Sequence, residues 1–368
     1  MVDDLIHIDG SQGEGGGQIV RSSLALSIVT GRPVTIERIR AGRSKPGLLN
    51  QHLTAVRAAR EICGGTVTGD AIGSSTFTFR PGEIIPGDYH FAIGTAGSAT
   101  LVLQTVLPPL LIAERPSRLI LEGGTHNPCA PPFDFLQRTF LPLVNRMGPK
   151  VTATLERPGF YPAGGGRFVV EIEPVPRDAT LSPNSGALRD LGLSSFHLLE
   201  RGEIRSQIGR VLLGNLPDQI AERELGELAR LGYWEPGCLV RESINTHGPA
   251  NAVVIEVASD HVTEVFVGLG ERGVKAEVVV QRAIDEMEEY LTANVPVGPH
   301  LSDQLMLPMA LSAWQSGVPE QRRQGSFRTM KLTDHSRTHI EIIQTFLGVS
   351  ITVDEAAVDD TTLVRVSR

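Results

Sequence analysis

The chain has 368 residues, of which 41% are hydrophobic and 21% are charged, the proportions of an ordinary globular protein. Its net charge of −8 argues against a general nucleic-acid-binding coat but leaves room for a local basic pocket. No apolar run is long enough to span a membrane and no signal peptide is visible, so we expect no membrane attachment. Cys63, Cys129 and Cys238 are odd in number and far apart, which favours a reducing, cytoplasmic compartment and disfavours a zinc site.

The first distinctive stretch is a glycine-rich turn at residues 10–17, which lies between a short apolar strand and an apolar helix expected at 22–29. Glycines before a helix let the backbone approach a ligand closely, and a helix N-terminus favours anions. The stretch is not a Walker A motif and lacks dinucleotide-binding spacing, so a plain strand-to-helix turn is the alternative. Because Glu14, Gln18 and Arg21 accompany the glycines, and the last two share a helix face, we predict a nucleotide or phosphate site.

A basic cluster follows the second predicted strand and consists of Arg40, Arg43 and Lys45. A helix is predicted immediately after it, at 46–63. Guanidinium groups match phosphate oxygens through paired hydrogen bonds, so the cluster predicts a phosphate site, with a solvated basic loop as the alternative. Gln51, one turn into the helix, is a further candidate for the same pocket.

The sequence repeats itself at long spacings. Gly31-Arg32-Pro33 resembles Glu114-Arg115-Pro116, 83 residues later (116 − 33), and Leu24–Ser27 resembles Met309–Ser312, 285 residues later (310 − 25). Repeated β-α-β-α-β units of about eighty residues imply pseudo-threefold packing in a closed domain. We therefore predict an α/β (α+β) fold with three such units in one large domain. The predicted ranges are 1–180 with 278–368 for the large domain, a third copy starting near Leu269, and 181–277 for a small inserted α+β domain.

The C-terminal repeat contains a candidate nucleophile, His335. It precedes an apolar run at 340–347 that ends in Gly348, a pattern typical of a helix with a glycine C-cap. We expect His335 to lie in the loop before this helix, close to a helix N-terminus that favours anions. A solvated loop histidine is the alternative.

Two further stretches are candidates for contact with a ligand. Residues 155–167 form a turn rich in proline and glycine, for which a tight corner between strands is an equally good interpretation. Residues 300–305 precede the apolar helix of the third repeat, and Ser302 or Asp303 would suit its N-cap.

Together these motifs resemble those of RNA 3′-terminal phosphate cyclases over almost the whole chain. The matching segments are Gly10–Arg21, Arg40–Arg43 with Pro46–Leu48, Gly124–Pro131, Gly159–Gly166, Leu301–Leu311 and the histidine before a Thr-x-Ile helix. The resemblance implies three repeats like the C-terminal domain of a translation initiation factor, related to the enolpyruvyl transferases, plus a small α+β insert. It also implies that ATP and a divalent metal, Mg²⁺ or Mn²⁺, are used to convert an RNA 3′-phosphate into a 2′,3′-cyclic phosphate, with release of AMP and pyrophosphate.

The resemblance also implies the role of each site residue. His335 would take AMP from the ATP α-phosphate and pass it to the RNA 3′-phosphate, after which the 2′-hydroxyl displaces AMP; His339 is the nearest rival. Glu14 would contact the metal or the ribose. The full implied set is Arg21, Arg40 and Arg43 with His335 for catalysis; Glu14, Gln18, Gln104, Pro131, His300, Leu301, Ser302, Asp303 and Gln304 for ATP; and Arg40, Arg43 and Gln51 for the RNA phosphate end. His300 stands where members of the family often carry tyrosine.

Two other interpretations remain. One is a catalytically inactive, cyclase-like protein of RNA processing or ribosome biogenesis, against which the retention of His335 and the arginines argues. The other is an enolpyruvyl transferase, which would form no covalent nucleotide. The expected partners are RNA 3′ ends and ATP, and the oligomeric state is open, with a homodimer as one possibility.

Overall fold

Three four-stranded sheets of one shared topology make up most of the computed structural model, which describes residues 4–175, 190–232, 234–356 and 360–368. In each sheet the first two strands run parallel, the second pairs antiparallel with the fourth, and the fourth pairs antiparallel with the third. A helical segment follows the first strand and another follows the second. The unit is thus β-α-β-α-β-β, which agrees with the three predicted repeats and adds one strand to each.

The elements of each repeat follow in chain order. The first repeat consists of β1 (Ile6–Asp9), α1 (Gly17–Thr30), β2 (Val34–Glu37), α2 (Asn50–Glu61), β3 (Thr66–Thr68) and β4 (Phe77–Arg80). The second consists of β5 (Asp88–Ala92), α3 (Ala99–Leu111), β6 (Ser117–Gly123), α4 (Phe133–Phe135), the π-helical turn η1 (Leu136–Phe140), α5 (Leu141–Arg146), β7 (Lys150–Arg157) and β8 (Gly166–Glu173). The third consists of β9 (His197–Leu198), α8 (Pro299–Trp314), α9 (Glu320–Arg323), β14 (Gly325–Met330), α10 (Asp334–Leu347), β15 (Ser350–Glu355) and β16 (Thr361–Ser367).

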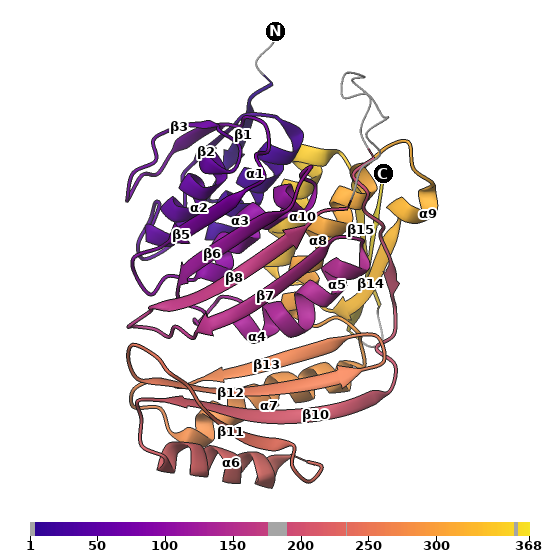
Figure 1. The fold of residues 1–368 in the computed structure, drawn as a ribbon. Coiled ribbons are helices and arrows are strands. Elements are labelled where there is room, and N and C mark those ends of the chain that lie inside the picture. The colour runs from indigo at the N-terminus through magenta and orange to yellow at the C-terminus, as the bar shows by residue number, and fades with distance from the viewer. Residues whose placement is uncertain (1–3, 176–189, 233, 357–359) are drawn as a thin grey trace.

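An inserted unit interrupts the third repeat after its first strand. It consists of β10 (Ile204–Gly214), α6 (Gln219–Leu231), β11 (Leu239–Ser243), β12 (Ala250–Ser259), β13 (Thr263–Leu269) and α7 (Ala276–Ala293). Its sheet has the order β11-β10-β12-β13 and lies at the bottom of Figure 1, below the second repeat.

The third repeat does not begin near Leu269 as predicted, because its first strand is β9, which pairs in parallel with β14. Helix α7 packs on β12 and β13, so it belongs with the insert by contact. We therefore propose bounds of 199–294 for the insert in place of 181–277. The predicted boundary at 181 lies outside the described residues.

The helices of the repeats pack together in the middle of the molecule. Helix α1 contacts α3 and α10, and α8 also contacts α10 (Figure 1). Most residues of α1, α3 and α8 are buried, as expected for helices enclosed on all sides. None of the helices within the described ranges is long and apolar enough to cross a membrane. Several polar side chains near the N-terminal ends of these helices, Gln18, Thr100, Ser302 and Asp303, are consequently held inside the molecule, whereas His300 is exposed.

Helix α2 begins at Asn50, four residues later than predicted from Pro46. Before it, the chain makes an irregular turn in which Arg38 and Arg40 have left-handed φ angles of 52° and 53°. The backbone N–H of Gly47 donates to a carbonyl across this turn. The basic cluster therefore sits on a folded loop and not on a helix end.

Helix α8 begins at Pro299, so Ser302 and Asp303 lie inside the helix and neither is its N-cap, contrary to the prediction. Gly298 occupies the N-cap position. Proline suits the first helical position because its fixed φ matches the helix and its missing N–H would be unpaired there.

Candidate active site

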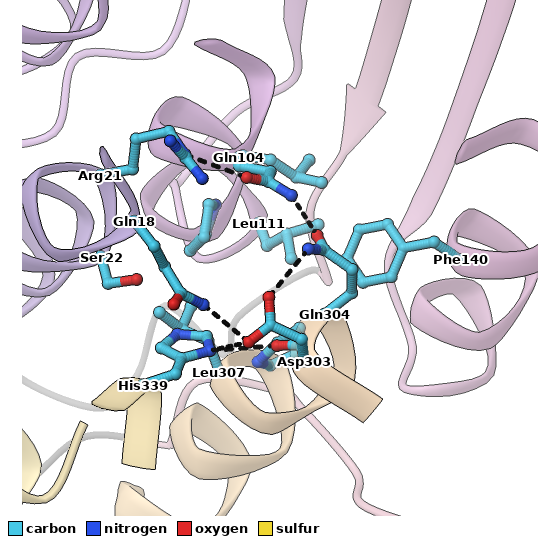
Figure 2. Close-up of a pocket in the computed structure, with 13 residues that line it drawn as sticks. Gln18, Arg21, Ser22, Gln104, Leu111, Phe140, Asp303, Gln304, Leu307 and His339 are labelled. Carbon is cyan, nitrogen blue, oxygen red and sulfur yellow. Dashed lines mark hydrogen bonds and ion pairs between the residues drawn. The ribbon is translucent and has the colours of Figure 1, made fainter. Parts of the chain in front are cut away.

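Polar side chains from α1, α3 and α8 meet at a cavity of about 40 Å³ (Figure 2). Gln18 Nε2 donates to Asp303 Oδ1 at 2.7 Å, and Arg21 Nε donates to Gln104 Oε1 at 3.1 Å. Gln104 Nε2 in turn donates to Gln304 Oε1 at 2.6 Å. The first two pairs are 285 and 83 residues apart, which are the spacings of the sequence repeats. Equivalent positions of different repeats therefore touch one another near a pseudo-threefold axis.

The other walls of this cavity are apolar. They are formed by Leu107, Pro108, Leu111, Phe140, Leu307 and Pro308. A second cavity, of about 10 Å³, shares Gln104, Leu107, Phe140 and Gln304 with the first and adds Thr100, Leu103, Pro131, Phe135 and Leu136. The Thr100 hydroxyl donates to the carbonyl oxygen of Pro131 at 2.8 Å and fixes that wall. Apolar walls with a few amide groups suit a flat, largely apolar ligand with polar edges.

His335 lies in the first turn of α10 and not in the preceding loop, because Thr333 is the N-cap of this helix. The Thr333 hydroxyl accepts a hydrogen bond from the backbone N–H of Ser336 at 3.1 Å. The imidazole is held between two carboxylates. Its Nδ1 contacts Glu14 Oε2, and its Nε2 lies 3.3 Å from Asp303 Oδ2. The ring is therefore oriented from both of its nitrogen atoms.

This arrangement changes the protonation of all three groups. Burial lowers the pKa of His335, but its hydrogen bonds to Asp303 and Glu14 and their charges raise it by more, so the net pKa is raised. Burial raises the pKa of Asp303, yet His335 and His339 hold that pKa well below its usual range. The pKa of Glu14 is raised by burial and lowered more strongly by His335 and Arg43, with a net decrease. The carboxylates stay ionised, and His335 keeps its proton to a higher pH than an ordinary histidine.

His339, the rival to His335, lies on the other side of Asp303. Its Nδ1 is 3.0 Å from the Asp303 carbonyl oxygen and 3.3 Å from Oδ1. Its side chain is only 6% exposed, against 34% for His335, and its Nε2 has no hydrogen-bond partner within the described residues. His339 is thus placed to orient Asp303, while His335 is the more accessible histidine.

Arg21 is a buried guanidinium group beside the cavity. Burial lowers its pKa to about 10, and the charges of Asp303 and Glu14 oppose that effect, so it remains protonated at neutral pH. None of the ion pairs among the described residues involves Arg21; its bond to Gln104 is to a neutral amide. A buried cation without a bonded carboxylate is typical of an anion-binding site.

His52 is a site residue that the sequence reasoning missed. It is 3% exposed, and burial, with smaller contributions from Arg21 and Arg40, lowers its pKa to about 3. The neutral ring accepts a hydrogen bond from the backbone N–H of Leu49 at 3.1 Å. It also leaves no room for a side chain at Gly17, where a Cβ would lie 2.4 Å from Nε2. The only sequence signal was its place beside Gln51 on the buried face of a predicted helix.

The two predicted phosphate-binding arginines of the loop have different surroundings. Arg43 is exposed, and its Nη2 contacts Glu14 Oε1, which brings it to the carboxylate that holds His335. Arg40 Nη1 donates to the carbonyl oxygens of Lys45 and Gly47 at 2.6 and 3.0 Å, so part of its guanidinium group holds the loop together. The loop thereby presents Arg43 at the site.

Four predicted residues lie away from the pair of His335 and Glu14. Gln51 accepts a hydrogen bond from the backbone N–H at the start of α3 at 3.1 Å. On α8, His300 is exposed, Leu301 is fully buried, and the Ser302 hydroxyl donates to the carbonyl oxygen of Pro299 at 2.9 Å. None of these four lines either cavity in the part of the chain that the structure describes.

No cluster of three or more histidine, cysteine, aspartate or glutamate side chains arranged to hold a metal ion occurs within the described residues. Glu14 and Asp303 both face His335 and remain ionised. Magnesium uses few protein carboxylates and takes the rest of its shell from phosphate and water. Glu14, which is 35% exposed, fits such a ligand better than the buried Asp303.

Comparison with known proteins gives consistent matches over nearly the whole chain. The family model described as RNA 3′-terminal phosphate cyclase matches residues 12–353. A curated RNA 3′-terminal phosphate cyclase from Koribacter versatilis (strain Ellin345) is 49% identical over 353 residues, which cover 96% of this chain and 92% of the relative. One from Ralstonia nicotianae (strain ATCC BAA-1114 / GMI1000) is 48% identical over 363 residues, which cover 98% of this chain and 96% of the relative.

Proposed function

The chain belongs to the RNA 3′-terminal phosphate cyclase family of enzymes, and on this premise we propose that it uses ATP to convert an RNA 3′-phosphate into a 2′,3′-cyclic phosphate through a histidine–AMP intermediate. The observation that carries the proposal is the His335 imidazole, which is oriented by Glu14 and Asp303 beside the buried cation Arg21. A fixed nucleophile next to an anion site is what transfer of a nucleotidyl group requires.

In the first step, the lone pair of His335 Nε2 attacks the α-phosphorus of ATP. The new P–N bond forms as the bond between that phosphorus and the bridging oxygen breaks, and pyrophosphate leaves with the electron pair. Glu14 accepts the Nδ1 proton in a hydrogen bond and so keeps the lone pair on Nε2. Any proton on Nε2 must leave to solvent before the attack.

In the second step, an oxygen of the RNA 3′-phosphate attacks the AMP phosphorus and the P–N bond to His335 breaks. In the third, the vicinal 2′-hydroxyl oxygen attacks the 3′-phosphorus, loses its proton to solvent, and expels AMP. Negative charge accumulates at phosphorus oxygens in every step. We assign its stabilisation to Arg21, Arg40 and Arg43, of which Arg21 is buried, Arg40 is half-buried and Arg43 is exposed.

We place the adenine ring of ATP across the two adjoining cavities, between Pro131 of the smaller one and Phe140, which lines both. The amides of Gln104 and Gln304 can each donate and accept, as the edge of adenine requires. Gln104 and Gln304 line both cavities and are hydrogen-bonded to each other at 2.6 Å. We infer that ATP breaks the hydrogen bond between the two amides and joins the cavities.

The implied divalent ion, Mg²⁺ or Mn²⁺, would be held by Glu14 together with phosphate oxygens and water, and it would neutralise charge on the triphosphate. We also propose a reducing, cytoplasmic compartment, because all 3 cysteines of the chain are free.

The deciding experiment incubates the full-length protein with ATP labelled at the α-phosphate and with Mg²⁺ or Mn²⁺, followed by a denaturing gel. We expect an acid-labile, alkali-stable adduct in the wild type and none in His335→Asn, which keeps a polar group but has no nucleophilic nitrogen. Addition of an RNA with a 3′-phosphate should then remove the label and make the RNA end resistant to phosphatase.

The other outcomes point to a different function or to a different nucleophile. No adduct with either metal favours the inactive, cyclase-like scaffold or an enolpyruvyl transferase, which transfer no nucleotide. An adduct that persists in His335→Asn moves the nucleophile elsewhere, and His339→Asn would be the next variant.

A further inference from the structure

A chain of polar contacts, buried at His126 and Asp134 and half-buried at Arg210, joins the insert to the segment that carries Pro131. Arg210 of β10 contacts one oxygen of Asp134 through Nη2, and the other oxygen lies 2.8 Å from His126 Nε2. The His126 side chain is fully buried and stacks on Phe160 with ring centroids 4.7 Å apart. The segment between His126 and Asp134 is therefore fixed at both ends. At the Asp134 end, the residue that fixes it is Arg210 of the insert.

A second buried link joins the insert to α8. Glu264 of β13 is 3% exposed, and its Oε1 accepts a hydrogen bond from the backbone N–H of Gly298 at 2.7 Å. Tyr290 of α7 adds a bond from its hydroxyl to the carbonyl oxygen of Pro296 at 3.3 Å. The insert thus holds the chain immediately before α8, two turns ahead of the helix surface that carries Gln304.

The two links end at different walls of one cavity, since Pro131 and Gln304 both line the smaller one. We propose that the insert is a clamp that holds the two walls of the nucleotide pocket in register, with Arg210 and Glu264 as its positioning residues. The proposal rests on ATP binding at this pocket, as argued above. Neither positioning residue lines the cavities within the described chain, so each acts through the segment to which it is bonded.

Simple packing does not account for these two residues. Apolar side chains would join the insert to the repeats without the desolvation cost of a half-buried guanidinium paired with the buried Asp134, or of the buried carboxyl group of Glu264. Burial raises the pKa of Glu264 to about 8, against the effect of two backbone N–H groups, so near neutral pH it is mainly an uncharged hydrogen-bond acceptor. Directional bonds fix the register of two segments, whereas apolar contact lets them slide.

The test uses the full-length protein and measures two quantities separately: the affinity for ATP, and the adenylylation rate at saturating ATP. We expect Arg210→Met and Glu264→Ala each to weaken ATP binding about tenfold while the adenylylation rate at saturating ATP stays within about threefold. Glu264→Gln should retain ATP affinity within about twofold, because its amide oxygen accepts the same N–H. Arg138→Met is the matched control, since Arg138 pairs with Glu256 across the same interface at 3.7 Å, is 53% exposed and should have no effect.

Amide hydrogen exchange without ATP gives a second, activity-independent readout. Arg210→Met should speed exchange in residues 124–135 and leave 297–304 unchanged, and Glu264→Ala should do the reverse. Unchanged ATP affinity in both variants, or an equal loss in Arg138→Met, would overturn the clamp, as would a Glu264→Gln variant as weak as Glu264→Ala.

A folding failure of a variant and a failure of the proposed function can each be told apart from a failure of the clamp. If Arg210→Met does not fold, Arg210→Lys replaces it, because lysine keeps the charge but not the paired donors. If the wild type binds ATP but forms no adduct, the histidine mechanism fails while the affinity and exchange data still decide the clamp.

Discussion

The two carboxylates beside His335, those of Glu14 and Asp303, have two opposing effects on its proposed reaction. They orient the ring, and the bond from Nδ1 to Glu14 keeps the lone pair on Nε2. They also stabilise the imidazolium, which has no lone pair to attack phosphorus. Under the proposed mechanism, His335 therefore becomes a nucleophile only when its extra proton has left.

The consequence is a defined pH dependence. We predict that the single-turnover rate of adenylylation rises with pH through an apparent pKa above the ordinary histidine value of 6.5. Glu14→Gln removes one of the two charges that raise this pKa, so its rise should begin at a lower pH even if its maximal rate falls. The raised pKa of His335 has the opposite pH dependence for the stability of the fold. Its stabilising contribution is fully present below pH 6.5 and is lost as the pH rises through the folded-state pKa. A rise in Glu14→Gln at the same or a higher pH would contradict this assignment.

Secondary-structure elements near the site were predictable where one local signal dominates. The C-terminal end of α10 at Gly348, with its left-handed φ of 61°, followed from the glycine alone. The start of α8 did not, because Ser302 and Asp303 looked like caps while Pro299 begins the helix. The Asp303 carboxylate is instead occupied by partners from other helices, Gln18 of α1 in the first repeat and His335 and His339 of α10. Such long-range partners have no local signature, which is also why His52 was missed.

One contact between elements is specific enough to test. Gly13, in the turn after β1, has a left-handed φ of 53°, and a Cβ there would lie 2.0 Å from Thr338 Oγ1 of α10. That hydroxyl is bonded to the carbonyl oxygen of Asp334 at 2.8 Å, so it resists displacement. We predict that Gly13→Ala pushes the adjoining Glu14 away from α10 and lowers the adenylylation rate at least about tenfold, since a small misplacement at a reacting group is costly.

The control for this variant is Gly31→Ala. Gly31 has a φ of 71° with no atom near an added Cβ, so alanine there brings only the left-handed backbone cost of about 1–2 kcal/mol. We expect a lower melting temperature in both variants but normal adenylylation in Gly31→Ala. Equal activities in the two variants would mean that the contact with Thr338 is unimportant.

At the scale of the whole molecule, the repeats explain why the polar site lies where it does. Equivalent positions near a threefold axis must meet, and the spacings of 83 and 285 residues return as the contacts Arg21–Gln104 and Gln18–Asp303. The sequence therefore predicted the repeats, and their spacings account for which of the predicted side chains touch. It missed the division of the third repeat, because β9 has only two residues and lies about a hundred positions before α8. A strand that short shows no periodicity, and only its pairing with β14 identifies it.

The overall charge limits how the protein grips RNA. A net charge of −8 disfavours a polyanion on average, so binding should depend on local contacts from the arginines of the site. Each phosphate neutralised on a single strand contributes about −0.7 to the slope of log affinity against log salt, so about three contacts from Arg21, Arg40 and Arg43 predict a slope near −2. We expect this slope in anisotropy titrations of a 3′-phosphorylated oligonucleotide with His335→Asn and no ATP, and a slope less steep by about 0.7 when Arg43→Ala is added. A slope steeper than about −4 would require more phosphate contacts than these three arginines supply, and would contradict this assignment.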